Sequence, residues 1–283
     1  MASSRSLPGK LLMVAWSAFL GFVIIVFGAG VWAALVTSNL TTTPAIPWAV
    51  PAMTLILWPM WRYLAGKWWP QSTSEARRRC LRAKRVPGEV FGWSLLTGLF
   101  AVAALAGFWI VTFQLVKMRG NALPDFSKYP ALTVAVIIAM GSVAAPFTEE
   151  PAFRGYCQVI LEREFRGTIA VAISSVLFAI AHGPTQGFLW PKLLFYFLVG
   201  VVFGTMAYLA KSILPAIPLH IVGLLVFFTL VWPHDADRRL VLEGGADAWF
   251  WIHVAQTVLF TALTIPAFFR LARVSEPQRS TDS

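Results

Sequence analysis

Residues 131–156 read ALTVAVIIAMGSVAAPFTEEPAFRGY. A run of apolar residues ends here in two adjacent carboxylates, Glu149 and Glu150, with Arg154 four residues further on. About 20 apolar residues suffice for a membrane-spanning helix, and an ionisable side chain within one normally faces a protein interior or a watery cavity. This stretch therefore indicates a membrane helix that carries a buried polar site.

The rest of the chain has the same apolar character. Of its 283 residues 58% are hydrophobic and 13% are charged, whereas soluble domains average about 25% charged residues. The sequence predicts an all-α, polytopic membrane protein that forms a single membrane domain over residues 1–283. It is expected to have about eight transmembrane helices, at 11–36, 46–65, 92–116, 131–147 running on to about 163, 167–184, 191–210, 212–231 and 249–269.

The Lys and Arg residues predict the orientation, because cytoplasmic loops are enriched in them. With the N-terminus in the cytoplasm, only six of the 23 fall outside, namely Lys117, Arg119, Lys128, Lys192, Arg238 and Arg239. Both termini are therefore expected in the cytoplasm. The net charge of +10 is assigned to loops that face anionic lipid, and no nucleic-acid partner is expected. The densest basic run, residues 74–85, is interpreted as a solvated or lipid-surface helix.

The Glu-Glu pair is predicted to begin a new helix inside the membrane. Thr148 is a suitable N-cap, Pro151 is tolerated in a first turn, and acids there interact favourably with the helix dipole. Pro146 supports an interruption just before the pair. A broken transmembrane helix is therefore expected at this motif, in a place where protein buries the backbone or water lines it.

Helical spacing assigns the two acids different roles. Glu150 and Arg154 are four residues apart and can pair on one face, whereas Glu149 shares its face with Phe153 and Tyr156. A carboxylate in a cavity beside a helix N-terminus is a candidate general base. Two acids that cap a helix at the membrane surface fit these residues equally well.

The chain has four histidines. His234 is expected in a solvated outer loop, and His253, among aromatic residues of the last span, is assigned to packing. His182 and His220 each lie within a predicted span. Together with the Glu-Glu motif they place polar residues in three spans, which favours one shared pocket.

A hairpin argument relates His182 to Glu149. The polar turn LEREFRG, residues 161–167, joins two apolar helices, and the midpoint between positions 149 and 182 falls inside it. Paired antiparallel helices would therefore bring Glu149 and His182 to a similar depth.

Three motifs occur in order along the chain: Glu149-Glu150-x-x-x-Arg154, Phe178-x-x-x-His182 and His220. In these the sequence resembles the CPBP family of intramembrane proteases, which comprises type II CAAX prenyl proteases and bacteriocin-processing (Abi) proteins. The resemblance covers roughly residues 140–230, the expected catalytic core. Further similar positions between the last two motifs are Phe197, Gly200, Gly204 and Ser212.

The resemblance implies an intramembrane endopeptidase that acts on a membrane-associated, prenylated or leader-bearing substrate. Glu149 with His182 would activate the water, and His220 would stabilise the oxyanion. Glu150, Arg154 and Phe178 would support them. The location implied is the plasma membrane of a bacterium or the endoplasmic reticulum of a eukaryote.

One position departs from the family pattern. The last motif is His-x-x-x-Asn or Asp, and position 224 holds Leu224. Loss of one oxyanion donor costs roughly 100- to 1,000-fold in turnover, so weakened activity is expected unless a water beside Gly223 replaces the donor.

Three alternatives remain open on the sequence. No cofactor is expected, but zinc held by Glu149, His182 and His220 is chemically reasonable, because two His and a carboxylate form a known catalytic set. A non-proteolytic scaffold or immunity factor of the same family would fit Leu224. An ion-coupled transporter would also carry intramembrane Glu and His, although no inverted repeat is evident.

Overall fold

The structure is a computed structural model that describes residues 6–118 and 126–281. All regular secondary structure in these ranges is helical, which confirms the predicted all-α class. The chain divides into two compact units. Two charges used for the orientation, Arg5 and Arg119, lie outside the described residues.

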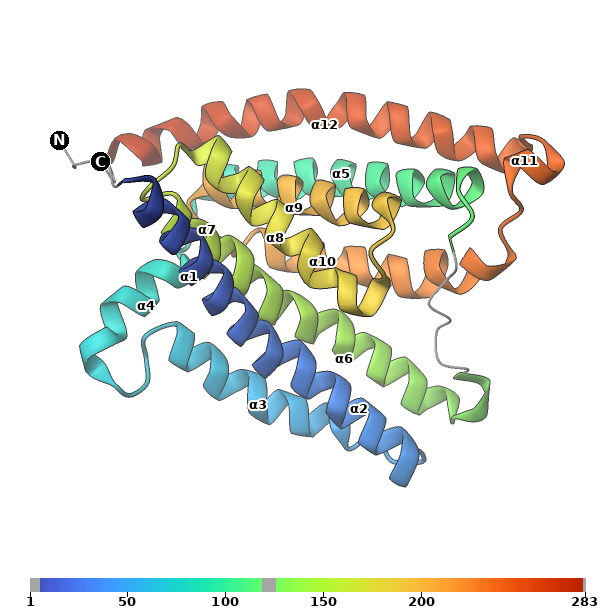
Figure 1. The fold of residues 1–283 in the computed structure, drawn as a ribbon, viewed down its shortest axis with the longest axis horizontal. Coiled ribbons are helices and arrows are strands. Elements are labelled where there is room, and N and C mark those ends of the chain that lie inside the picture. The colour runs from blue at the N-terminus through green and yellow to red at the C-terminus, as the bar shows by residue number, and fades with distance from the viewer. Residues whose placement is uncertain (1–5, 119–125, 282–283) are drawn as a thin grey trace. The chain divides into compact units, whose positions relative to one another are not determined.

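The first unit comprises residues 6–84 and 126–174. Its elements, which Figure 1 labels where there is room, are α1 (Leu7–Ile25), η1 (Val26–Gly30), α2 (Val31–Thr42), α3 (Ala49–Leu64), η2 (Gln71–Thr73), α4 (Ser74–Leu81), η3 (Phe126–Lys128), α6 (Ala131–Glu149), η4 (Glu150–Cys157), α7 (Gln158–Leu161) and the first part of α8 (Gly167–Gln186).

The second unit comprises residues 85–118 and 175–281. It contains the rest of α8, then α5 (Gly88–Leu115), α9 (Trp190–Ala210), α10 (Ala216–Val226), η5 (Phe227–Val231), η6 (Trp232–Asp237), α11 (Val241–Gly244) and α12 (Ala248–Thr281).

Hydropathy explains these elements. Within the described ranges seven helical stretches are long and apolar enough to cross a membrane, and each coincides with a predicted span. The stretches are Leu7–Thr42, Gly88–Leu115, Ala131–Leu161, Gly167–Gln186, Trp190–Ala210, Ala216–Asp235 and Ala248–Glu276. The eighth predicted span corresponds to α3, whose 16 residues are fewer than the roughly 20 of a typical crossing. The multi-span, all-α architecture is thus confirmed, and about eight transmembrane helices are consistent with these lengths.

In the first unit, three consecutive elements form one continuous helix, α1–η1–α2, which packs with α3 against α6 (Figure 1). Met53 and Leu57 of α3 meet Ala144 of α6 in a buried apolar cluster. Two glycines allow the N-terminal helix to come close to the Glu-Glu region, as described below.

The interruption predicted at the Glu-Glu motif takes a different form. The helix continues through the motif, and it changes from α to π type between Glu149 and Glu150. Thr148 is not an N-cap, because its hydroxyl donates to the carbonyl of Ala145 within α6 (2.9 Å). The expected cap was therefore wrong, and a π-helix stands where a break was predicted.

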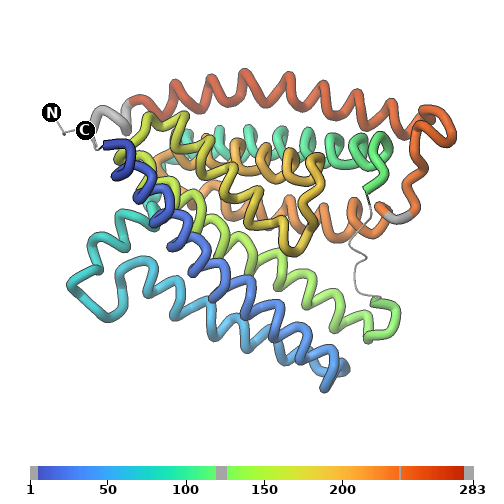
Figure 2. Tube along the Cα trace, viewed as in Figure 1, coloured from blue at the N-terminus to red at the C-terminus, as the bar shows by residue number. Residues whose placement is uncertain are grey.

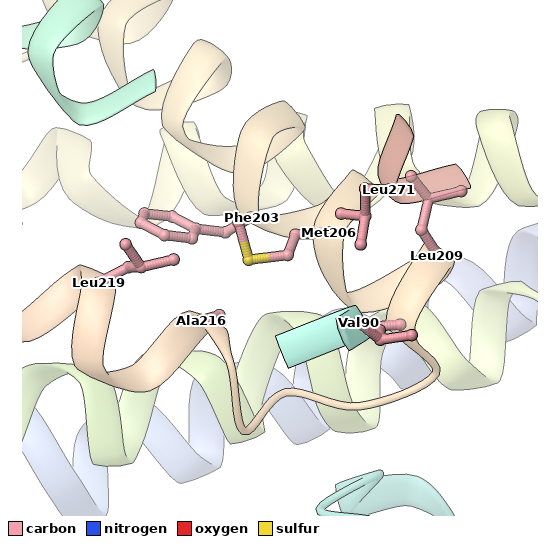
Figure 3. Close-up of a cluster of buried hydrophobic side chains, with 8 residues drawn as sticks. Val90, Phe203, Met206, Leu209, Ala216, Leu219 and Leu271 are labelled. Atoms are coloured by element: carbon pink, nitrogen blue, oxygen red, sulfur yellow. The ribbon is translucent and has the colours of Figure 1, made fainter. Parts of the chain in front are cut away.

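In the second unit, α5 packs against α9, α10 and α12. Figure 3 shows the core on their shared side, where Phe203 and Met206 of α9 lie beside Leu219 of α10 and Leu271 of α12. Side chains fill the space around Gly98 of α5 so closely that a Cβ there would overlap Leu219. α8 and α9 are joined by the short connection 187–189, and the trace in Figure 2 reverses there.

Candidate active site

In the first unit, the Glu-Glu motif lies where α6 ends and the buried π-helix η4 begins, with Glu150 as the first residue of η4. The side chains of Glu150 and Arg154 are 0% and 1% exposed, and Glu150 Oε1 lies 3.3 Å from Arg154 Nη1. This confirms the predicted pairing at a spacing of four residues. Glu149, one residue earlier at the end of α6, is partly exposed, so the two acids have different surroundings.

Tertiary contacts explain why a π-helix is tolerated here. Gly21 of α1 faces the carbonyl of Ala152 at 3.5 Å, measured from the Cβ that an alanine would add, and Gly28 leaves no room for a Cβ beside Thr148. The hydroxyl of Ser174 donates to the carbonyl of Phe153 (2.9 Å). π-helical turns are rare and occur often at functional sites, and this one is enclosed by its neighbours.

The segment of residues 66–84, called the α4 segment, is held against the C-terminal end of α3 by Arg77. Arg77 donates to the carbonyls of Tyr63 (2.6 Å), Trp68 (2.7 Å) and Pro70 (2.7 Å). Its guanidinium also lies over the Tyr63 ring at 4.2 Å. Arg77 is therefore a structural residue that shapes the turn after α3.

The α4 segment also contacts the π-helix and the residues after it. Arg82 forms a two-pronged ion pair with Glu162, one arm of which measures 3.0 Å. Gly155 lies under the backbone of the segment, where an added Cβ would be 3.1 Å from the carbonyl oxygen of Cys80. Burial raises the pKa of the Cys80 thiol above its ordinary value, and the nearby Arg163 guanidinium partly offsets this.

These contacts correct the interpretation of the basic run as a solvated or lipid-surface helix. Arg77, Cys80 and Leu81 form a buried face of α4, whereas Arg78 and Arg79 are exposed on the other side. Arg77 and Arg82 of the run therefore anchor the segment to the protein.

The second unit holds His182 near the end of α8. Its Nδ1 lies 2.9 Å from the carbonyl oxygen of Phe178, one turn earlier. A carbonyl oxygen can only accept, so in the neutral imidazole Nδ1 carries the hydrogen and Nε2 carries the lone pair. The imidazole ring also stacks on Tyr196 of α9 (centroids 4.0 Å apart, planes 16° apart) and leans against Phe178 (4.4 Å, 57°).

His220 lies on α10, where it is buried and stacks on Phe203 of α9 (5.1 Å, 15°). Leu224 follows one helical turn later on the same face, as the spacing predicts. Gly223 faces α5 instead, because a Cβ there would lie 3.5 Å from Val102 Cγ2. The missing side chain of Gly223 is therefore on the α5 side of α10.

α9 supports both histidines of the second unit. Tyr196 and Phe203 are seven residues apart, which places them on one face of α9, about 10 Å apart along its axis. His182 and His220 are thus arranged along that face, two turns from each other.

The structure brings together some of the predicted residues. Phe178 contacts His182, and Glu150 pairs with Arg154. Glu149 belongs to the first unit and the two histidines to the second, so their meeting in one pocket stays a prediction. His234 is exposed. His253 Nδ1 lies 2.9 Å from Gln256 Oε1, and Gln256 donates to the carbonyl of Ala103 on α5, which agrees with a packing role.

Within each unit's described residues, no three His, Cys, Asp or Glu side chains are grouped to hold a metal ion. The zinc alternative takes Glu149 from one unit and two histidines from the other. The zinc alternative therefore stays a prediction, because neither unit by itself contains all three proposed ligands.

Sequence reasoning missed Tyr196, although a signal was present. The midpoint between positions 182 and 196 is 189, which lies in the connection between α8 and α9. The hairpin argument used for Glu149 and His182 would also have placed Tyr196 opposite His182.

Comparison with known families gives one match. Residues 130–226 match the model of the family described as type II CAAX prenyl endopeptidase, Rce1-like. No curated protein and no solved structure matches the chain significantly. The matched stretch contains the Glu-Glu motif, His182, His220 and Leu224, and it covers about a third of the chain. The predicted resemblance to the CPBP family is thus confirmed over residues 130–226, the stretch that matches the Rce1-like type II CAAX prenyl endopeptidase model.

Proposed function

We propose that this multi-pass membrane protein is an intramembrane endopeptidase. The observation that carries the proposal is the hydrogen bond from His182 Nδ1 to the Phe178 carbonyl (2.9 Å), within a domain of an endopeptidase family. This bond leaves the lone pair of the neutral imidazole on Nε2, and in the proposed reaction that lone pair accepts a hydrogen bond from the water that Glu149 deprotonates. The buried Glu150–Arg154 pair supplies a fixed helix beside the second carboxylate, Glu149.

In the proposed reaction, Glu149 takes a proton from a water that His182 also holds. The hydroxide attacks the peptide carbonyl carbon, a C–O bond forms, and the carbonyl electron pair moves to oxygen. His220 donates a hydrogen bond to this oxyanion. When the C=O double bond re-forms, the C–N bond breaks, and the proton on Glu149 passes to the leaving nitrogen. The products are a carboxylic acid and an amine.

The family description and the membrane setting support a proposal for the substrate class. Each described candidate residue lies in an apolar helix, so a substrate that carries its own lipid or apolar segment can reach it from within the bilayer. A prenylated CAAX peptide is the first substrate to test, and a leader-bearing or membrane protein is the second.

The test is cleavage by purified protein in liposomes. A farnesylated CAAX peptide should be cleaved by the wild type and not by Glu149→Gln, while its unprenylated form should be cleaved less. Glu89→Gln, an exposed carboxylate 3.5 Å from Arg270, should cleave as the wild type does. Absence of cleavage in lipids that support a related protease would overturn the proposal.

One observation favours a second candidate, a non-proteolytic member of the family. Leu224 stands one turn after His220 on α10, where the family pattern has an amide or carboxylate. Binding of a membrane partner that survives Glu149→Gln, together with absence of cleavage, would support this candidate.

A further inference from the structure

We propose that Tyr196 is a positioning residue for His182, and that its ring holds the imidazole in the orientation which proton transfer needs. The inference rests on the proposed function and adds a residue to that site. All contacts that carry it lie within the second unit.

Three contacts define the orientation of the imidazole. The Phe178 carbonyl fixes the Nδ1 edge (2.9 Å), the Tyr196 ring covers one face (4.0 Å, 16°), and the Phe178 ring touches at an angle (4.4 Å, 57°). The terminal torsion of histidine is broad and roughly two-fold, and a nearly parallel ring at 4.0 Å restricts rotation about it. Within the second unit, the stack with Tyr196 therefore constrains the plane of the imidazole.

Tyr196 is itself held in place from behind. Its ring lies 5.4 Å from Phe195 and 6.4 Å from Trp109, both edge-on. The backbones of α8 and α9 come close one helical turn further along α9, where a Cβ on Gly200 would be 2.7 Å from Ser175 Cβ. This close approach sets the separation of the two helices, and hence the distance at which Tyr196 can stack on His182.

Phe195 provides a matched control. It is the neighbouring aromatic residue, and it packs on Trp109 (4.6 Å) and Phe227 (6.1 Å) in the apolar core. Replacing either residue with Leu removes one ring from α9. Only at Tyr196 does the lost ring touch the imidazole of His182.

The kinetic test compares three variants in liposomes with the farnesylated peptide. Tyr196→Leu should lower kcat by about 10- to 100-fold, since small misplacements of a catalytic group have effects of this size, and KM should change less than about two-fold. Tyr196→Phe keeps the stacking ring and should restore kcat to within about three-fold of the wild type. Phe195→Leu removes an edge contact of Tyr196 but no ring contact of His182, so it should lower Tm and should lower kcat less than Tyr196→Leu does. If Tyr196→Leu and Phe195→Leu lost the same factor of kcat for the same decrease in Tm, the proposal would be overturned.

A second measurement needs no activity. The chain has four histidines, so the ring signals of His182 can be assigned by NMR through their absence in His182→Gln. The ring protons should show a ring-current shift in the wild type and Tyr196→Phe. The shift should be clearly smaller in Tyr196→Leu, where Phe178 still contributes, and unchanged in Phe195→Leu. The imidazole ¹⁵N shifts should report the Nδ1–H tautomer in the wild type and averaging of the two tautomers in Tyr196→Leu.

The two measurements separate the inference from the proposed function. If the wild type does not cleave, the proposed function fails. The NMR comparison still tests whether Tyr196 positions His182. A smaller ring-current shift in Tyr196→Leu, with no change in Phe195→Leu, supports this contact. Unchanged His182 signals in Tyr196→Leu overturn the positioning role, whether or not the wild type is active.

Discussion

Glu149 and Glu150 are neighbours in the sequence but differ in burial. Glu150 is fully buried against Arg154, so Glu150→Gln would leave a buried guanidinium without this counter-charge. Removal of one partner from a buried pair costs about 3–5 kcal/mol, and we expect a correspondingly lower Tm in detergent. Glu149→Gln should leave Tm close to that of the wild type and abolish cleavage.

The exposed pair of Glu89 and Arg270 is the control for this prediction, because both side chains are more than half exposed. Glu89→Gln should change stability by less than about 1 kcal/mol, as exposed ion pairs contribute little. Full activity of Glu149→Gln would show that another group is the base. An unchanged Tm in Glu150→Gln would show that the buried pair contributes nothing to stability.

A second prediction concerns Leu224. An Asn at position 224 would offer an amide donor one turn from His220. Leu224→Asn should therefore raise kcat by about ten-fold or more on the peptide substrate. Gly223→Asn is the control, because its side chain would point toward Val102 of α5, and it should raise kcat much less. If neither changes kcat while His220→Ala is inactive, a different group donates to the oxyanion.

Among the elements, the π-helix η4 depends on what surrounds it. Gly155 leaves only 3.1 Å between an added Cβ and the carbonyl oxygen of Cys80, so Gly155→Ala must push the α4 segment away. We expect a loss of about 1–3 kcal/mol in stability, the usual cost of overpacking. Gly92→Ala in α5 meets nothing within 4 Å and should raise stability by up to about 1 kcal/mol through helix propensity.

Thermal unfolding of the two glycine variants in the same detergent measures this difference. If Gly155→Ala is as stable as Gly92→Ala, the α4 segment is not held against η4. The α4 segment lies outside the matched residues 130–226, so a large effect would show that the domain depends on the chain that precedes it.

The sequence predicted the positions of the helices and contacts within a helix well, but it predicted contacts between distant residues poorly. Hydropathy located the seven stretches long enough to span a membrane and the shorter α3, and the spacing of four residues predicted the pair of Glu150 and Arg154. The π-helix was not predicted, because residues distant in the sequence, such as Gly21 and Ser174, enclose it. The burial of Arg77 was missed for the same reason, since its partners are backbone carbonyls that composition does not reveal.

For the whole molecule, the open question is how the chain crosses the membrane. Seven described stretches are long enough to span it, and α3, with 16 residues, is about 24 Å long against a hydrocarbon core of about 30 Å. The predicted excess of Lys and Arg on the cytoplasmic side of the membrane requires α3 to cross the bilayer. If α3 did not cross, the N-terminus and the α4 segment would lie on opposite sides.

Cysteine labelling in intact cells decides between these topologies. The buried Cys80 and Cys157 would first be replaced by Ala, and single cysteines introduced at Ser72 and at Asp237, both of which are exposed. Ser74 is less suitable because its hydroxyl donates to the carbonyl of Gly66. Five spans separate positions 72 and 237, so a membrane-impermeant maleimide should label Asp237→Cys directly and Ser72→Cys only after permeabilisation. An N-terminal epitope tag should behave like Ser72→Cys, because α1–η1–α2 and α3 then cross in opposite directions. Labelling of both cysteines from one side would refute the eight-span topology, and a tag on the side opposite to Ser72→Cys would show that α3 does not cross.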